Sequence, residues 1–128
     1  MKNYDPNTAP DPAAWNLIDE GERIVMIINW HQEAGIDLPN EVVHATFHAV
    51  IESQAALGDE TPVAATLERL QKDAIDRHEA IHCIGSALAE YLYQMQSASE
   101  EDAEKLNQQY FENVEALSIQ QWKAQFSE

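Results

Sequence analysis

The segment DRHEAIHCIGSALAEYLYQMQ, residues 76–96, has the pattern of a long amphipathic helix. Asp76 is a good helix N-cap, and Glu79 three residues later gives the spacing of a capping box. Apolar side chains then recur three or four positions apart, which places them on one stripe of a helix. This stripe, which we expect to face the core, consists of Ile81, Ile84, Leu88, Tyr91 or Leu92, and Met95.

Cap and stop signals divide the rest of the chain in a similar way. Asp11-Pro12 begins a helical stretch that reaches Ala34, and Gly21 is the expected point of division into two pieces. Further helices are expected over residues 40–57, 62–70 and 99–126, the last with a bend, and no segment alternates with the period of a strand. We therefore predict an all-α bundle of five to six helices, with a polar N-terminal arm at residues 1–10 and one helical domain at residues 11–128.

The charge of the chain limits its partners. Among 128 residues, 23 are acidic and 7 are basic, which gives a formal net charge of −16. Such a chain repels phosphate backbones and anionic lipid surfaces, so we expect neither nucleic acid nor membrane partners. The same field attracts divalent cations, although solubility alone also explains an acidic surface. The polar start of the chain and the single cysteine, Cys83, favour a cytoplasmic protein without an intrachain disulfide, and a homodimer remains an open alternative.

Four of the five histidines form two pairs with a spacing of four residues. The pairs are His44 with His48 and His78 with His82, and each falls on a predicted helix. Residues four apart lie on the same helix face, about 6 Å apart along the axis, so their imidazoles can chelate one ion. If the two helices face each other, the pairs supply four nitrogen ligands, which suit zinc, nickel or iron rather than magnesium. The sequence does not tell which histidine of one pair faces which histidine of the other.

Two carboxylates accompany these pairs. Glu52 follows His48 by four residues, and Glu79 follows His78 directly. His44 and Glu52 are about 12 Å apart along a helix, too far to bind the same ion. Glu52 is therefore expected either to bind a second ion or to accept a hydrogen bond that orients an imidazole. We include both glutamates with the four histidines as candidate metal-site residues.

Two resemblances involve the same segments. His78-Glu79-Ala80-Ile81-His82 resembles the HExxH motif of zincin metalloproteases, which implies His78 and His82 as zinc ligands and Glu79 as the general base of a hydrolase. The position of Glu79 at a helix start and the lack of a peptide-binding strand weigh against this reading. The stretches of residues 44–54 and 76–86 also resemble an uncharacterised bacterial helical domain family, a resemblance that implies no activity.

Other interpretations remain open for the histidines. His31 has no partner four residues away, so we interpret it mainly as a helix-end residue and only secondarily as an additional ligand. Cys83 points about 100° away from His82 on a helix and is interpreted as a small buried residue. The alternative to a metal site is an interaction module without catalysis, in which the histidines belong to buried hydrogen-bond networks. The sequence supports no substrate and leaves open whether the protein is an enzyme.

Overall fold

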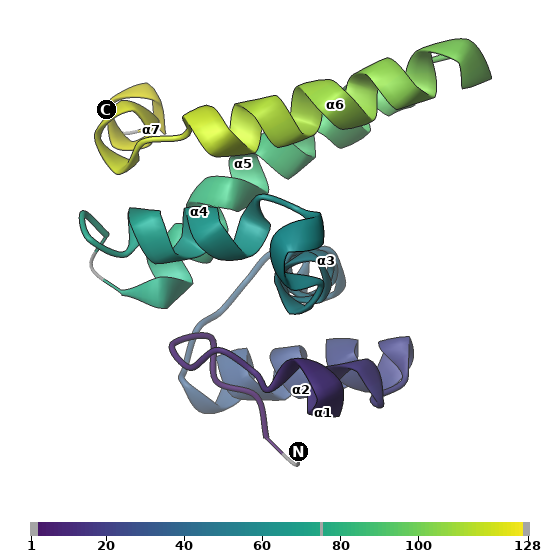
Figure 1. Ribbon diagram of the computed structural model, residues 1–128. Helices are drawn as coiled ribbons and strands as arrows, with labels where there is room; N and C mark the ends of the chain where they lie inside the picture. The colour runs from purple at the N-terminus through teal and green to yellow at the C-terminus, as the bar shows by residue number, and fades with distance from the viewer. Residues whose placement is uncertain (1–2, 75, 127–128) are drawn as a thin grey trace.

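The computed structural model describes residues 3–74 and 76–126, and their regular structure is entirely helical (Figure 1). The prediction of an all-α fold is confirmed, although the helices exceed the expected five to six. Residues 1 and 2 of the predicted arm and residues 75, 127 and 128 of the predicted domain lie outside these ranges. The helices are α1 (Pro12–Asn16), α2 (Glu20–Glu33), α3 (Glu41–Ala56), α4 (Val63–Leu70), α5 (Arg77–Met95), α6 (Glu100–Ala116) and α7 (Ile119–Phe126), with a 3-10 turn η1 (Gly58–Glu60) between α3 and α4.

The additional helices arise from two breaks. The first helical stretch does divide, but before Gly21 rather than at it: α1 ends at Asn16, and the carboxylate of Asp19 accepts a hydrogen bond from the amide of Gly21 at 3.0 Å to cap α2. Near the C-terminus, Leu117 has φ −61° and ψ 144°, an extended conformation that separates α6 from α7. Backbone geometry at these points, rather than a change in apolar period, sets the helix number.

The helices that carry the histidine pairs begin where side chains cap them. The side chain of Asn40 accepts a hydrogen bond from the amide of Val43 at 3.2 Å, and that of Asp76 accepts one from the amide of Glu79 at 2.9 Å. Each cap satisfies an amide that has no partner within the helix. At the end of α2, Gly35 has φ +75°, a left-handed conformation that favours glycine and turns the chain toward α3.

Helix α3 is the centre of the fold. It contacts α1 and α2 on one side and α4 and α5 on another, and α6 and α7 pack against α5 (Figure 1). One apolar cluster joins α3 to α4, α5, α6 and α7, and a second joins α3 to α1, α2 and Tyr4 of the N-terminal arm. The face of α3 between these clusters buries polar residues, including His48 and Glu52. None of the helices within residues 3–74 and 76–126 has the length and apolar character needed to span a membrane.

Candidate metal centre

Five histidines from three helices converge where α2, α3 and α5 meet. Helix α2 contributes His31 from its last turn, while the pairs come from α3 and α5. One ring nitrogen from each histidine can be chosen so that all five lie within 4.8 Å of one another. The cluster brings together all four paired histidines of the sequence prediction and adds a fifth ring. Its members are His31, His44, His48, His78 and His82.

Three of the rings direct the same type of nitrogen at one another. The Nε2 atom of His48 lies 3.1 Å from Nε2 of His44 and 3.3 Å from Nε2 of His82, and the latter two are 3.2 Å apart. For metal–nitrogen bonds of about 2.1 Å, neighbouring ligand atoms lie about 3.0 Å apart at right angles and about 3.4 Å apart at the tetrahedral angle. The triangle therefore has the dimensions of three imidazole ligands around one ion.

Ring contacts define how the five imidazoles are arranged. The ring of His48 contacts all four others, with centroid distances of 4.8 to 5.4 Å. The other four rings make a closed cycle with centroid distances of 4.4 to 5.2 Å, in the order His31, His44, His82, His78. Among these five described residues, His31 with His82 and His44 with His78 are the pairs without a ring contact. The connectivity is that of a square pyramid with His48 at its apex.

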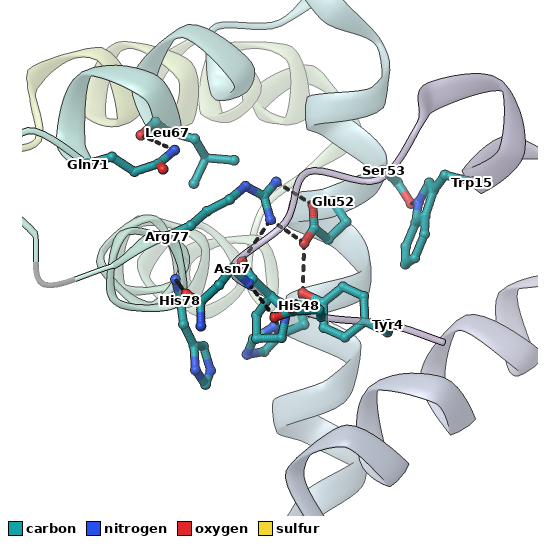
Figure 2. Close-up of polar contacts among 12 residues, drawn as sticks. Tyr4, Asn7, Trp15, His48, Glu52, Ser53, Leu67, Gln71, Arg77 and His78 are labelled. Atoms are coloured by element: carbon teal, nitrogen blue, oxygen red, sulfur yellow. Dashed lines mark hydrogen bonds and ion pairs between the residues drawn. The ribbon is translucent and has the colours of Figure 1, made fainter. Parts of the chain in front are cut away.

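A hydrogen-bond chain sets the tautomer of His48. The hydroxyl of Tyr4 donates to Oε2 of Glu52 at 2.7 Å and lies 3.1 Å from Nδ1 of His48 (Figure 2). Burial, together with the charge of Glu52, raises the pKa of Tyr4, so the hydroxyl keeps its proton. Since that proton is donated to Glu52, the hydroxyl oxygen accepts from Nδ1–H of His48. The Nε2 atom of His48 is left with its lone pair directed into the cluster.

Glu52 is itself held by a buried arginine. Arg77 donates to both carboxylate oxygens of Glu52, at 2.7 and 2.8 Å, and also to the carbonyl oxygen of Pro6 at 3.0 Å (Figure 2). Asn7 accepts a hydrogen bond from the amide of His78 at 3.1 Å. The N-terminal arm therefore packs against both helices that carry the histidine pairs, and it supplies the hydroxyl that orients His48.

The Nε2 atoms of His31 and His78 are buried and lack a hydrogen-bond partner among the described residues. For His31, Nδ1 lies 2.8 Å from the carbonyl oxygen of Ile27 and must carry the proton, because a carbonyl only accepts. Its Nε2 is therefore the ring nitrogen that is left buried without a partner. Leaving such a group unsatisfied costs about 1–3 kcal/mol. A cation within the cluster would satisfy the nitrogens of both rings.

The four paired histidines are uncharged at neutral pH. Burial, reinforced by the neighbouring imidazoles, lowers the pKa of His44, His78 and His82 to about 4. The pKa of His48 is lowered further for the same reasons. Neutral imidazole is the form that binds metal ions, so a cation would not first have to displace ring protons.

The two candidate glutamates take other positions. Glu52 lies beside the cluster but is not part of it, and both of its oxygens bond to Arg77 or Tyr4. Glu52 thus accepts from Tyr4, which in turn contacts His48, rather than directly from an imidazole, and these bonds leave little scope for binding a second ion. Glu79 is also outside the cluster, and its carboxylate forms an ion pair with Lys123 at 3.2 Å.

The thiol of Cys83 is not in the cluster either, and burial raises its pKa to about 11.

The sequence indicated His31 only secondarily as a ligand and gave no indication that Tyr4 or Arg77 lies at the site. His31 does lie near the end of its helix, as expected, but it is only 3% exposed and belongs to the cluster. Spacing gives no signal for it because no second histidine lies on α2. Tyr4 and Arg77 reach the site across 44 and 25 residues of sequence, so no local pattern links them to His48 or Glu52.

The fold and this cluster define the class of the chain: a small helical domain with five histidines gathered between three helices. Comparison with protein families gives its membership. The chain belongs to the family described as Domain of unknown function (DUF1841), which matches residues 12–125. This agrees with the expected resemblance to an uncharacterised helical family and has no bearing on the zincin motif. No match was found among curated proteins or among solved structures.

Proposed function

We propose that this protein binds a single transition-metal ion through His31, His44, His48, His78 and His82. The observation that carries the proposal is the convergence of one ring nitrogen from each of the five histidines within 4.8 Å, together with the buried Nε2 atoms of His31 and His78, which have no hydrogen-bond partner within the described part of the chain. A network of histidines alone would leave these nitrogens unsatisfied, whereas an ion could satisfy them together. The formal charge of −16 favours the approach of a cation.

The number of ligands favours some ions over others. Structural zinc sites are almost always four-coordinate, whereas five nitrogens in a square pyramid suit an ion that accepts five or six ligands. Nickel(II) and iron(II) are therefore the preferred candidates, and zinc is the third. Neutral imidazoles without a carboxylate ligand also favour these metals over magnesium or calcium.

The geometry gives less support to an HExxH hydrolase. A zincin-type reaction needs the glutamate to face the metal-bound water, but the Glu79 carboxylate lies against Lys123. In addition, His31, His44 and His48 surround the same point as His78 and His82, where a substrate would have to bind. An interaction module with structural histidines is the alternative that the following experiment tests.

The test is elemental analysis of protein purified without a histidine tag. We expect about one equivalent of metal per chain in the wild type and almost none in the double variant His44→Ala, His82→Ala. The matched control is Glu79→Gln, which alters a carboxylate on the helix of one histidine pair that is not among the clustered ligands and should retain its metal. A wild-type protein that binds no nickel, iron or zinc, even after incubation with each ion, would contradict the proposal and support the interaction module.

A further inference from the structure

The N-terminal arm, described here over residues 3–10, lies across both helices that carry a histidine pair (Figure 2). On α3, the hydroxyl of Tyr4 is 3.1 Å from Nδ1 of His48. On α5, Arg77 donates a hydrogen bond at 3.0 Å to the carbonyl oxygen of Pro6. Tyr4 is 3% exposed and Pro6 is fully buried, so the docked arm covers a surface of the helical domain. The arm therefore connects the two helices that supply four of the five candidate ligands.

Two of its hydrogen bonds reach members of the histidine cluster directly. One is the contact of Tyr4 with the ring of His48, and the other joins the side chain of Asn7 to the backbone amide of His78 at 3.1 Å. The amide of His78 lies in the first turn of α5, where the helix itself offers no acceptor. Release of the arm would therefore remove a partner from two candidate ligands at once.

An ion in the cluster would strengthen the attachment of the arm. A cation on Nε2 of His48 withdraws electron density from the ring, so Nδ1–H becomes a stronger donor to the Tyr4 hydroxyl. Loss of such a partner from a ligating imidazole lowers metal affinity about 10- to 100-fold. Linked equilibria affect each other by the same factor. The ion should therefore favour the docked arm over the released arm by about 10- to 100-fold.

We propose that the N-terminal arm is a metal-responsive strap. A bound ion holds it against α3 and α5, and loss of the ion increases its release, which uncovers the surface beneath Tyr4 and Pro6. The inference rests on the proposed function, since the ion supplies the coupling. It gives the protein two forms that differ at their surface according to whether a buried site is occupied.

The experiment measures amide hydrogen exchange by NMR in the metal-free and the zinc-loaded protein, since zinc is diamagnetic. The amide of His78 reports on the strap because its acceptor is Asn7 of the arm. The amide of Glu79 is the internal reference, since its acceptor is the side chain of Asp76, 2.9 Å away at the start of the same helix. We expect zinc to slow exchange at His78 at least tenfold more than at Glu79.

Two variants show whether this protection comes from the arm. Both side chains are exposed, so neither change should prevent folding. Asn7→Ala removes the acceptor, and exchange at the His78 amide should then respond to zinc no more than exchange at Glu79. Thr8→Ala is the matched control, because the Thr8 hydroxyl bonds within the arm to Asp5 at 3.3 Å. This variant should keep the extra effect of zinc at His78.

The outcomes separate this inference from the proposed function. A wild-type protein that binds no metal would overturn both. Zinc binding that slows exchange equally at His78 and Glu79 would overturn the strap alone. Extra protection at His78 that persists in Asn7→Ala would also overturn it, because the protection would then come from the ion at the helix and not from the arm.

Discussion

The hydroxyl of Tyr4 lies 3.1 Å from Nδ1 of His48 and 2.7 Å from Oε2 of Glu52. It therefore links the apex of the histidine cluster to the buried ion pair of Glu52 with Arg77. His48 is 1% exposed, so its ring has no water to replace this partner. The contact determines which nitrogen of His48 is available to an ion. We therefore expect loss of the contact to lower metal affinity more than it lowers the stability of the fold.

Removal of the Tyr4 hydroxyl is the most direct test of this relationship. Tyr4→Phe keeps the aromatic packing against Trp15 but leaves Nδ1 of His48 without an acceptor. We expect metal affinity to fall about 10- to 100-fold, as is usual when the partner of a ligating imidazole is removed. Competition with a chromogenic chelator measures the change. Tyr93→Phe, at a side chain that is 72% exposed, is the matched control, and an equal loss in both variants would disprove the role of Tyr4.

The buried pair of Arg77 and Glu52 should dominate the stability of the same region. Both side chains are almost fully buried and make two direct hydrogen bonds. Glu52→Gln should therefore lower the free energy of unfolding by about 3–5 kcal/mol, because it leaves the guanidinium charge unpaired. Urea unfolding of the metal-free protein measures this loss.

The pair of Lys123 and Glu79 provides the comparison. The side chain of Lys123 is 46% exposed, and a surface ion pair of this kind contributes about 0–1 kcal/mol. Lys123→Gln should therefore have a small effect. A loss for Glu52→Gln no larger than that for Lys123→Gln would show that the buried pair is not a major determinant of stability.

The sequence predicted the fold class because local signals for helices are strong in this chain. Asp76 caps α5, and Gly35 adopts the left-handed conformation expected at a helix end. The orientation of α3 was harder to predict. The apolar residue Val43 is half exposed, whereas the acidic residue Glu52 on the same helix is 1% exposed. A prediction of the buried helix face from apolar periodicity assumes that carboxylates face water. This assumption fails for Glu52, because its carboxylate is paired with Arg77, which is distant in the sequence.

The candidate site was partly predictable for a related reason. Spacing within one helix identifies His44 with His48 and His78 with His82, because both members of a pair are local in sequence. Spacing within a helix gives no information on how different helices pack. That packing places His44 against His82, and His48 against both His78 and His82. His31 and Tyr4 depend entirely on that packing.

His31 provides a test of whether the fifth ring is a ligand. His31→Gln removes the imidazole while keeping a polar side chain of similar size in the last turn of α2. We expect the melting temperature of the metal-loaded protein to fall toward that of the metal-free protein, since binding at 100 times Kd contributes about 2.7 kcal/mol. The melting temperature without metal should change by less. Equal losses with and without a chelator would assign His31 a purely structural role.

The metal-free protein should lose stability as pH falls from about 6.5 toward 4. The pKa of His44, His78 and His82 is lowered to about 4 in the folded chain, whereas an unfolded chain binds these protons near pH 6.5. Between these values the unfolded state holds more protons, so the free energy of unfolding decreases as pH falls.

Thermal unfolding at pH 7.5, 6.5 and 5.5 in the presence of a chelator measures this dependence in a range above the titration of most carboxylates. We expect the melting temperature to fall by at least roughly 5 °C over the range. The variant His44→Asn, His82→Asn should show a shallower dependence, because two of the shifted groups are gone. An identical slope in the variant would mean that the two histidines are not responsible for the loss, since the carboxylates are common to both proteins.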